Sequence, residues 1–129
     1  MIIIDTHVWI WLVSEPKKLS RKAQAALNYA KTIGVCPISC WEISTKVAQG
    51  KLTLDRDIRV WVQQALARPH ISLTDISADI AITAGQLGQQ GFHGDPADRL
   101  IAATAMQNSV ELVTKDKNLR DFSAVRTVW

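Results

Sequence analysis

The sequence has few cysteines and no long hydrophobic run. It contains two Cys in 129 residues, without a CxxC pair or a His-rich cluster, so neither a disulfide framework nor a zinc site is expected. No stretch approaches the roughly 18 apolar residues that a membrane-spanning helix requires. The apolar N-terminal run is interrupted by Asp5 and lacks the basic start of a signal peptide. We therefore expect a soluble, cytoplasmic protein with free thiols.

Several motifs of nucleotide-binding and hydrolytic enzymes are also absent. Gly88, Gly91 and Gly94 are not followed by the Gly-Lys-Ser/Thr of a phosphate-binding loop, and we expect them to form a flexible loop. No serine lies in a nucleophile-elbow sequence, and the three His residues lack a common ligand spacing. A P-loop enzyme is therefore excluded, and a Ser-His-Asp hydrolase is not supported.

The overall composition is that of one ordinary globular domain spanning residues 1–129. Apolar residues make up 47% of the chain and charged residues 21%, and this length buries a core without disulfides or structural metal. Trp is unusually frequent, with five Trp against one Tyr and two Phe. Most Trp residues are expected in the core or an interface, although indole rings also stack on unpaired bases.

Short apolar runs alternate with helical patterns along the chain. Strands are predicted at residues 2–4, 33–37, 71–73, 111–114 and 125–129. Helices are predicted at 7–13, after Ser20, at 39–49 and 57–67, after Ser77, and at 98–107. This alternation predicts an α/β fold, with a parallel β-sheet of four or five strands flanked by α-helices.

Four acidic residues lie where strands end or helices begin. Asp5 ends the run of three Ile, and Asp116 follows Leu112-Val113-Thr114-Lys115. Glu42 and Asp98 lie just inside predicted helix starts. The carboxyl ends of parallel strands and the adjoining helix starts form one edge of a sheet, so these carboxylates are expected to converge. Convergent carboxylates repel one another unless a cation lies among them, which predicts a hard divalent metal.

Three of these four residues also have a purely structural interpretation. Ser39 and Glu42 fit a capping box, which favours a structural role for Glu42 by about 60 to 40 when it is taken alone. Asp98 lies at the third position of a helix capped by Asp95, and Asp116 fits the start of a turn. Only Asp5 requires donors or a cation, because burying a lone charge at a strand end costs several kcal/mol or more.

The net charge of +3 becomes more pronounced outside the acidic set. Removing four of the 12 acidic residues leaves eight against 15 basic ones, an excess of +7. An acidic pocket on a basic body suits a polyanion held by its phosphates. Net charge alone does not distinguish nucleic-acid binding from simple solubility.

Four segments, taken in order, resemble PIN-domain ribonucleases, and most closely the VapC toxins of type II toxin–antitoxin pairs. They are Ile3-Ile4-Asp5-Thr6-His7, Glu42 after the second strand, Asp98-Arg99-Leu100-Ile101-Ala102-Ala103-Thr104-Ala105, and Leu112-Val113-Thr114-Lys115-Asp116. The resemblance covers essentially the whole chain. It implies a PIN-like fold and a Mg²⁺- or Mn²⁺-dependent endoribonuclease. It also implies a homodimer and a VapB-like antitoxin whose tail lies across the active-site groove.

The resemblance assigns catalytic and metal-binding roles to Asp5, Glu42, Asp98 and Asp116, with Asp95 as a supporting residue. Thr6 and Thr114 lie beside the two strand-end aspartates and are expected to hydrogen-bond carboxylates or the scissile phosphate. Lys46, Arg99 and Lys115 are candidates for contacts with the RNA backbone. The expected reaction is in-line attack of water on single-stranded or loop RNA, leaving 5′-phosphate and 3′-hydroxyl ends.

Two other hypotheses remain open at the level of the sequence. One is a receiver-like signalling domain with a phosphorylatable Asp, although adjacent acidic residues after strand one and a phosphoacceptor after strand three are not visible. The other is a PIN-like module that binds RNA or a partner without cutting, against which the intact acidic set argues. The sequence does not specify the RNA target.

Overall fold

A parallel five-stranded sheet forms the centre of the protein in a computed structural model that describes residues 1–129. The strand order is β3-β2-β1-β4-β5. The strands are β1 (Ile2–Ile4), β2 (Ile33–Val35), β3 (Ile71–Leu73), β4 (Leu112–Val113) and β5 (Thr127–Val128). The predicted α/β class and parallel sheet are confirmed, with five strands. The last two strands are shorter than expected.

Strand β1 lies in the middle of the sheet, where all three of its isoleucines are buried. Ile3 pairs with Gly34 of β2 on one side and with Leu112 of β4 on the other. A side chain at Gly34 would place its Cβ 2.6 Å from Cδ1 of Ile3, so the close approach of these strands requires glycine. Ile2 and Ile4 face one core cluster and Ile3 faces the other, as the alternation of a strand dictates.

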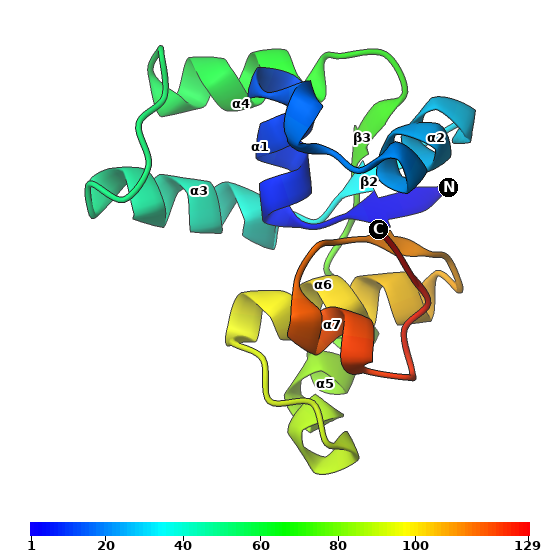
Figure 1. Cartoon of the computed structure of the whole chain (residues 1–129). Coiled ribbons are helices and arrows are strands. Elements are labelled where there is room, and N and C mark those ends of the chain that lie inside the picture. Colours follow the sequence, from blue (N-terminus) through cyan, green and yellow to red (C-terminus); the bar gives the residue numbers. More distant parts are fainter.

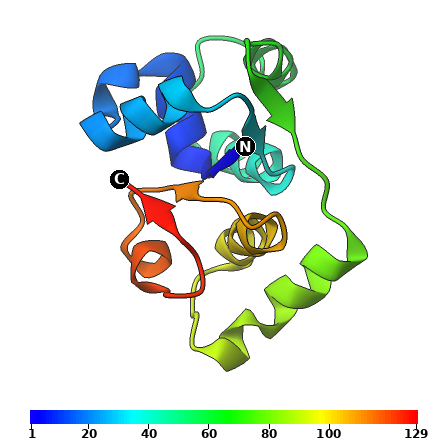
Figure 2. The same ribbon diagram turned by 90° about the vertical axis from the view of Figure 1, so that its right-hand side faces the viewer.

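Helices cover both faces of the sheet, as Figure 1 shows. On one side lie α1 (Thr6–Ser14), α2 (Arg21–Tyr29), α3 (Ile38–Ala48) and α4 (Ile58–Leu66). On the other lie α5 (Ala78–Gln86), α6 (Pro96–Gln107) and α7 (Lys117–Asp121), with α5 on the outside of α6 in Figure 2. Two short 3₁₀ helices, η1 (Pro16–Lys18) and η2 (Leu87–Gln90), complete the chain. The short helix α7 replaces the turn expected after Asp116.

The glycine segment before α6 is anchored, which corrects the expected flexible loop. Residues 87–90 form η2, and Gly91 takes the left-handed conformation with φ +90° that ends it. Phe92 is only 2% exposed and packs on Phe122 with ring centroids 5.1 Å apart. A Cβ at Gly94 would overlap the Phe92 ring, so glycine is needed for this packing. The segment therefore holds the start of α6 in place.

The five Trp residues divide between core and surface. Trp9 and Trp61 are buried and meet edge to face at 5.2 Å, as expected of core residues. Trp41 is 58% exposed.

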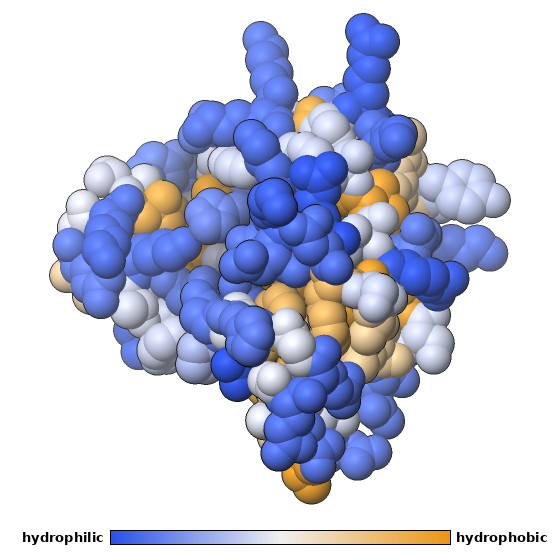
Figure 3. Space-filling view, turned by 60° about the horizontal axis from the view of Figure 1, so that its bottom comes forward, coloured by the Kyte–Doolittle hydropathy of each residue, from blue (hydrophilic) through white to orange (hydrophobic).

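The face turned forward in Figure 3 is mostly polar, with an apolar band near its centre. None of the helices combines the length and apolar character needed to cross a bilayer.

Candidate active site

The sheet has its topological switch point between β1 and β4. The chain runs from β1 outward to β2 and β3, and later returns to the other side of β1 as β4. In an open parallel sheet the ligand crevice lies beyond the carboxyl ends of the strands at this point. Asp5 directly follows β1, and Asp116 follows β4 after two residues. In Figure 1 the strands run toward the side where α1, α3 and α6 begin.

Asp5 is buried at the end of β1, as predicted, and finds its donors within the protein. Its Oδ1 accepts a 2.9 Å hydrogen bond from the backbone N–H of Val8, which makes Asp5 the N-cap of α1. Its Oδ2 accepts a hydrogen bond from the Thr114 hydroxyl. Burial raises the pKa of Asp5, and the hydrogen bonds from Thr114 and Val8 oppose that change. A cation at this carboxylate would relieve its desolvation.

Asp98 lies at the electrostatic centre of the acidic residues. Burial is the largest cause that raises its pKa, and the charges of Asp95, Asp116, Glu42 and Asp5 add to it, so that together they bring the pKa to about 7. Its carboxylate oxygens accept no hydrogen bond, and its backbone N–H donates to Asp95. The structure therefore brings the predicted acidic residues together at one sheet edge, where their mutual repulsion favours a bound cation.

A hydroxyl pair holds Glu42 against the start of α1. The Thr6 hydroxyl donates a hydrogen bond to Oε1 of Glu42, and the Thr6 and Ser39 hydroxyl oxygens are 2.9 Å apart. Thr6 and Ser39 are both buried. The capping-box interpretation of Ser39 and Glu42 is wrong, because α3 already begins at Ile38 with Pro37 as N-cap. The spacing of Ser39 and Glu42 predicts a cap and gives no sign that the Ser39 hydroxyl lies beside Thr6.

Asp95 and Arg99 organise the first turn of α6. Oδ1 of Asp95 accepts a 2.9 Å hydrogen bond from the Asp98 N–H, which confirms Asp95 as the N-cap. Nε of Arg99 donates to the Gly94 carbonyl at 2.9 Å, so this guanidinium fastens the glycine segment to α6. Asp116 plays the same capping part for α7, accepting from the Leu119 N–H at 3.0 Å.

The other two candidate basic residues lie beside α1. Nζ of Lys46 is 3.4 Å from Nε2 of His7, and Nζ of Lys115 lies 6.0 Å from the centroid of the Trp11 ring. His7 is the residue after Thr6, so both ammonium groups flank the helix that begins at the carboxylates. They are well placed for a polyanion.

The residues of the site fit a hard divalent cation by chemistry and charge. Carboxylate and hydroxyl oxygens are the donors that Mg²⁺ and Mn²⁺ prefer. The structure has no group of three or more His, Cys, Asp or Glu side chains arranged to hold a metal as they stand. Mg²⁺ does not need one, because it keeps several water ligands and takes one or two carboxylates. Asp98, whose oxygens are free of hydrogen bonds, is the most available ligand.

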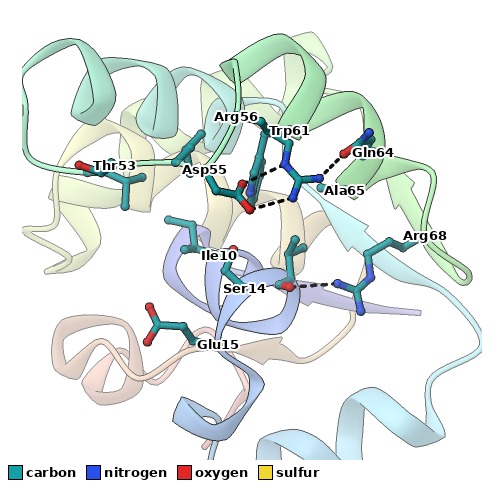
Figure 4. Close-up of a pocket in the computed structure, with 13 residues that line it drawn as sticks. Ile10, Ser14, Glu15, Thr53, Asp55, Arg56, Trp61, Gln64, Ala65 and Arg68 are labelled. Atoms are coloured by element: carbon teal, nitrogen blue, oxygen red, sulfur yellow. Dashed lines mark hydrogen bonds and ion pairs between the residues drawn. The ribbon is translucent and has the colours of Figure 1, made fainter.

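A separate groove of about 570 Å³ lies between α1, α4 and the segment before α4 (Figure 4). It contains none of the four predicted catalytic carboxylates. Arg56 is paired with Asp55 at 2.8 Å and with Gln64, and Arg68 donates to backbone carbonyls of α1 at 3.4 Å. Its guanidinium groups are already engaged, which separates this groove from the carboxylate site in both place and chemistry.

The fold agrees with comparisons to known proteins. The PIN domain family model matches residues 2–125, and the chain belongs to that family. The sequence is 39% identical over 130 residues to Ribonuclease VapC22 of Mycobacterium tuberculosis, covering 99% of this chain and 98% of that protein. The predicted resemblance to VapC-like PIN domains is confirmed.

Solved structures show the same fold at low sequence identity. A toxin–antitoxin complex from Klebsiella pneumoniae matches with a TM-score of 0.67 and 23% identity, covering 97% of this chain and 95% of that one. VapBC2 from Rickettsia felis, bound to a DNA fragment from its promoter, matches with a TM-score of 0.70 and 18% identity, covering 98% and 97%. At this level of identity the likeness concerns the fold alone.

Proposed function

We propose that this protein is a divalent-cation-dependent endoribonuclease that cuts single-stranded or loop RNA. The chain is a VapC-like PIN ribonuclease of the toxin class found in toxin–antitoxin pairs, since it is 39% identical to a VapC ribonuclease over nearly its full length. The observation that carries the metal-dependent chemistry is the position of Asp5 at the end of β1, beside the switch point of the sheet, where the Thr114 hydroxyl links it to Asp116 beyond β4. Residues 1–129 act as one nuclease domain.

Each acidic residue has a distinct part in the proposed site. Asp5 and Asp98 would hold the principal cation, with Asp116 and Glu42 completing its surroundings directly or through water. When bound, Mg²⁺ or Mn²⁺ would supply a more acidic water and would neutralise charge on the phosphate oxygens. Thr114 orients Asp5 through its hydroxyl, and Asp95 caps the helix that carries Asp98.

Thr6 performs the corresponding task for Glu42, because its hydroxyl donates to that carboxylate. Lys46 and Lys115 contact the phosphates of the RNA, and Arg99 supports the loop before α6 through its hydrogen bond to the Gly94 carbonyl. Water attacks the phosphorus in line with the bond to the 3′ oxygen, and that bond breaks. The products carry a 5′-phosphate and a 3′-hydroxyl, with the proton of the water passing to the leaving oxygen.

The partner in the cell is a VapB-like antitoxin. The solved relatives include toxin–antitoxin complexes from several bacteria, which supports this class of partner. We propose that the antitoxin tail covers the carboxylate edge and so blocks RNA. A homodimer and a cytoplasmic location complete the proposal.

The receiver-like alternative is disfavoured because the PIN domain family model matches residues 2–125 of the chain. A non-catalytic binding module would keep the fold and lose cation binding. Titration with Mn²⁺ therefore separates that alternative from the nuclease.

The decisive experiment compares RNA cleavage by three proteins in Mg²⁺ or Mn²⁺. Wild type and Asp75→Asn should cut single-stranded RNA, because Asp75 is exposed and lies outside the acidic set. Asp5→Asn should lower the cleavage rate at least about 100-fold, the scale seen when one preorganised electrostatic group is lost. Full cleavage by Asp5→Asn, or by wild type in excess EDTA, would sink the assignment.

A further inference from the structure

Three aromatic rings form a strip that starts beside the carboxylates. His7 and Trp11 are four residues apart on α1, with ring centroids 5.7 Å apart and planes inclined by 48°. Trp11 meets Trp129 at 5.9 Å and 50°. His7 follows Thr6, which bonds the carboxylate of Glu42, so one end of the strip adjoins the acidic edge. We refer to His7, Trp11 and Trp129 as the aromatic strip.

The strip is anchored and accessible at the same time. Trp11 and Trp129 pack one edge against the first core cluster and remain partly exposed, and His7 is exposed. Trp9 and Trp61, by contrast, are enclosed in that core. A ring that is held by the core and partly exposed is a rigid surface, so the protein loses little conformational entropy when a ligand stacks on its exposed part.

Two unpaired ammonium groups flank the strip. Lys46 reaches His7 and Lys115 lies over Trp11. Neither forms a salt bridge, since the ion pairs of the protein are those of Lys18, Arg56 and Lys117. Their charges are therefore available to an anionic ligand. Aromatic rings between cationic side chains match the alternation of base and phosphate along a single nucleic-acid strand.

We infer that the aromatic strip is a base-stacking subsite for single-stranded RNA, with the phosphates lying against Lys46 and Lys115. The inference rests on the proposed function, because it places the substrate of the same site. The strip would lead unpaired nucleotides along α1 to the carboxylate edge. Bases within a duplex are already stacked on each other, so this subsite favours single strands.

The test measures binding separately from cutting. A fluorescently labelled oligoadenylate and the same oligonucleotide with abasic sites in place of its bases are titrated in EDTA, and fluorescence anisotropy is recorded. Wild type should bind the oligoadenylate more tightly than the abasic oligonucleotide. Each stacked base should account for a difference in affinity of roughly 5- to 100-fold. Equal affinity for the two oligonucleotides would overturn the inference without any variant.

Variants then locate the effect on the strip. Trp11→Leu should weaken binding of the oligoadenylate and leave the abasic oligonucleotide unchanged, and Trp11→Phe should recover part of the loss because it restores a ring. Tyr29→Leu is the matched control, since Tyr29 is a 93% exposed aromatic residue on α2. Circular dichroism confirms that each variant is folded, and Trp129→Leu replaces Trp11→Leu if the latter unfolds.

Charge is tested in the same assay. Lys46→Gln and Lys115→Gln should weaken the binding of both oligonucleotides to the same extent. They should also make the affinity depend less steeply on salt concentration. A folded Trp11→Leu that binds oligoadenylate like wild type would overturn the inference. If it also loses binding to a VapB-like antitoxin, the strip contacts protein instead. Failure of the proposed function is a different result, in which RNA binds in a base-dependent way and stays uncut in Mg²⁺.

Discussion

The Thr114 hydroxyl donates a hydrogen bond to the carboxylate of Asp5, a residue 109 positions earlier in the chain. The same oxygen accepts the backbone N–H of Asp116 at 3.0 Å. One buried hydroxyl thus ties together the ends of β1 and β4, on either side of the switch point. It adds a side-chain link to the backbone hydrogen bond of 3.2 Å from the Asp5 N–H to the Val113 carbonyl.

Replacing Thr114 by Val should therefore damage both the site and the fold. The shape is kept while the hydroxyl is lost, so the Asp5 Oδ2 and the Asp116 N–H lose their partner. We expect roughly 1–3 kcal/mol less stability from the unsatisfied buried group. Cleavage should fall about 10- to 100-fold, as for other residues that orient metal ligands. Urea unfolding and RNA cleavage rates measure the two effects.

The matched control is Thr127→Val in β5. Its side chain makes no hydrogen bond, so the same chemical change should leave both stability and cleavage near those of wild type. If Thr114→Val behaves like Thr127→Val, the hydroxyl of Thr114 has no role in positioning Asp5.

A second prediction concerns Glu42 and the two hydroxyls that hold it. Thr6→Val removes the donor to Glu42, and we expect cleavage to fall about 10- to 100-fold. Ser39→Ala keeps the Thr6 hydroxyl and removes only the Ser39 hydroxyl beside it, so it should lower cleavage less. Ser44→Ala changes an exposed residue of the same helix and should be neutral. Cleavage by Thr6→Val at the wild-type rate would show that Glu42 needs no such support.

The acidic edge should make the metal-free protein less stable as the pH rises. The pKa of Asp98 is about 7 in the folded protein against 3.8 for an unperturbed Asp, so the folded state holds the proton more tightly. The free energy of unfolding should then decrease from about pH 4 to about pH 7, and the penalty is fully present above that range. Burial raises the pKa of Asp5 and acts in the same direction.

Urea unfolding in EDTA across this pH range measures the effect. The side chain at position 98 does not titrate in Asp98→Asn. The free energy of unfolding of this variant should therefore change less with pH than that of wild type. Mg²⁺ or Mn²⁺ should stabilise wild type more at pH 8 than at pH 5, since the cation competes with the protons of the carboxylates. A wild-type stability that rises steadily from pH 4 to pH 7 would contradict the electrostatic description of the site.

Two glycines offer a prediction about the support beneath α6. Gly94→Ala would force a methyl group into the Phe92 ring, and we expect a loss of about 1–3 kcal/mol in stability from overpacking. Gly85→Ala lies within α5 with no atom near its new Cβ, so it should gain about 0.5–1 kcal/mol. If the glycine segment is anchored, thermal unfolding should show a lower melting temperature for Gly94→Ala and a higher one for Gly85→Ala. If the segment is mobile, the two melting temperatures should shift in the same way.

Much of the fold followed from local patterns in the sequence. The three isoleucines of β1 predicted a buried strand, and side-chain caps such as Ser20, Ser77 and Asp95 marked helix starts at the observed residues. Asp5 could be assigned a special role because an acidic residue that ends a buried strand must find partners. These are short-range effects, and a sequence displays them directly.

Other features depend on tertiary contacts that a sequence does not display. Ser39 resembled a capping residue, and only the packing of α1 on α3 turns its hydroxyl toward Thr6. The helix after Asp116 has five residues, too few for a hydrophobic period to appear. Phe92 gave no sign that it would anchor a glycine-rich segment. Trp129 joins Trp11 only because the sheet brings the C-terminal strand beside α1.

The central place of β1 in the sheet has a consequence for how a cell makes this enzyme. The ribosome makes Asp5 and Glu42 well before Asp98 and Asp116. At about 5–20 residues per second, roughly 5–20 s of translation separate the first strand from its partner β4. The acidic edge is therefore incomplete on the nascent chain until β4 has been made and has paired with β1.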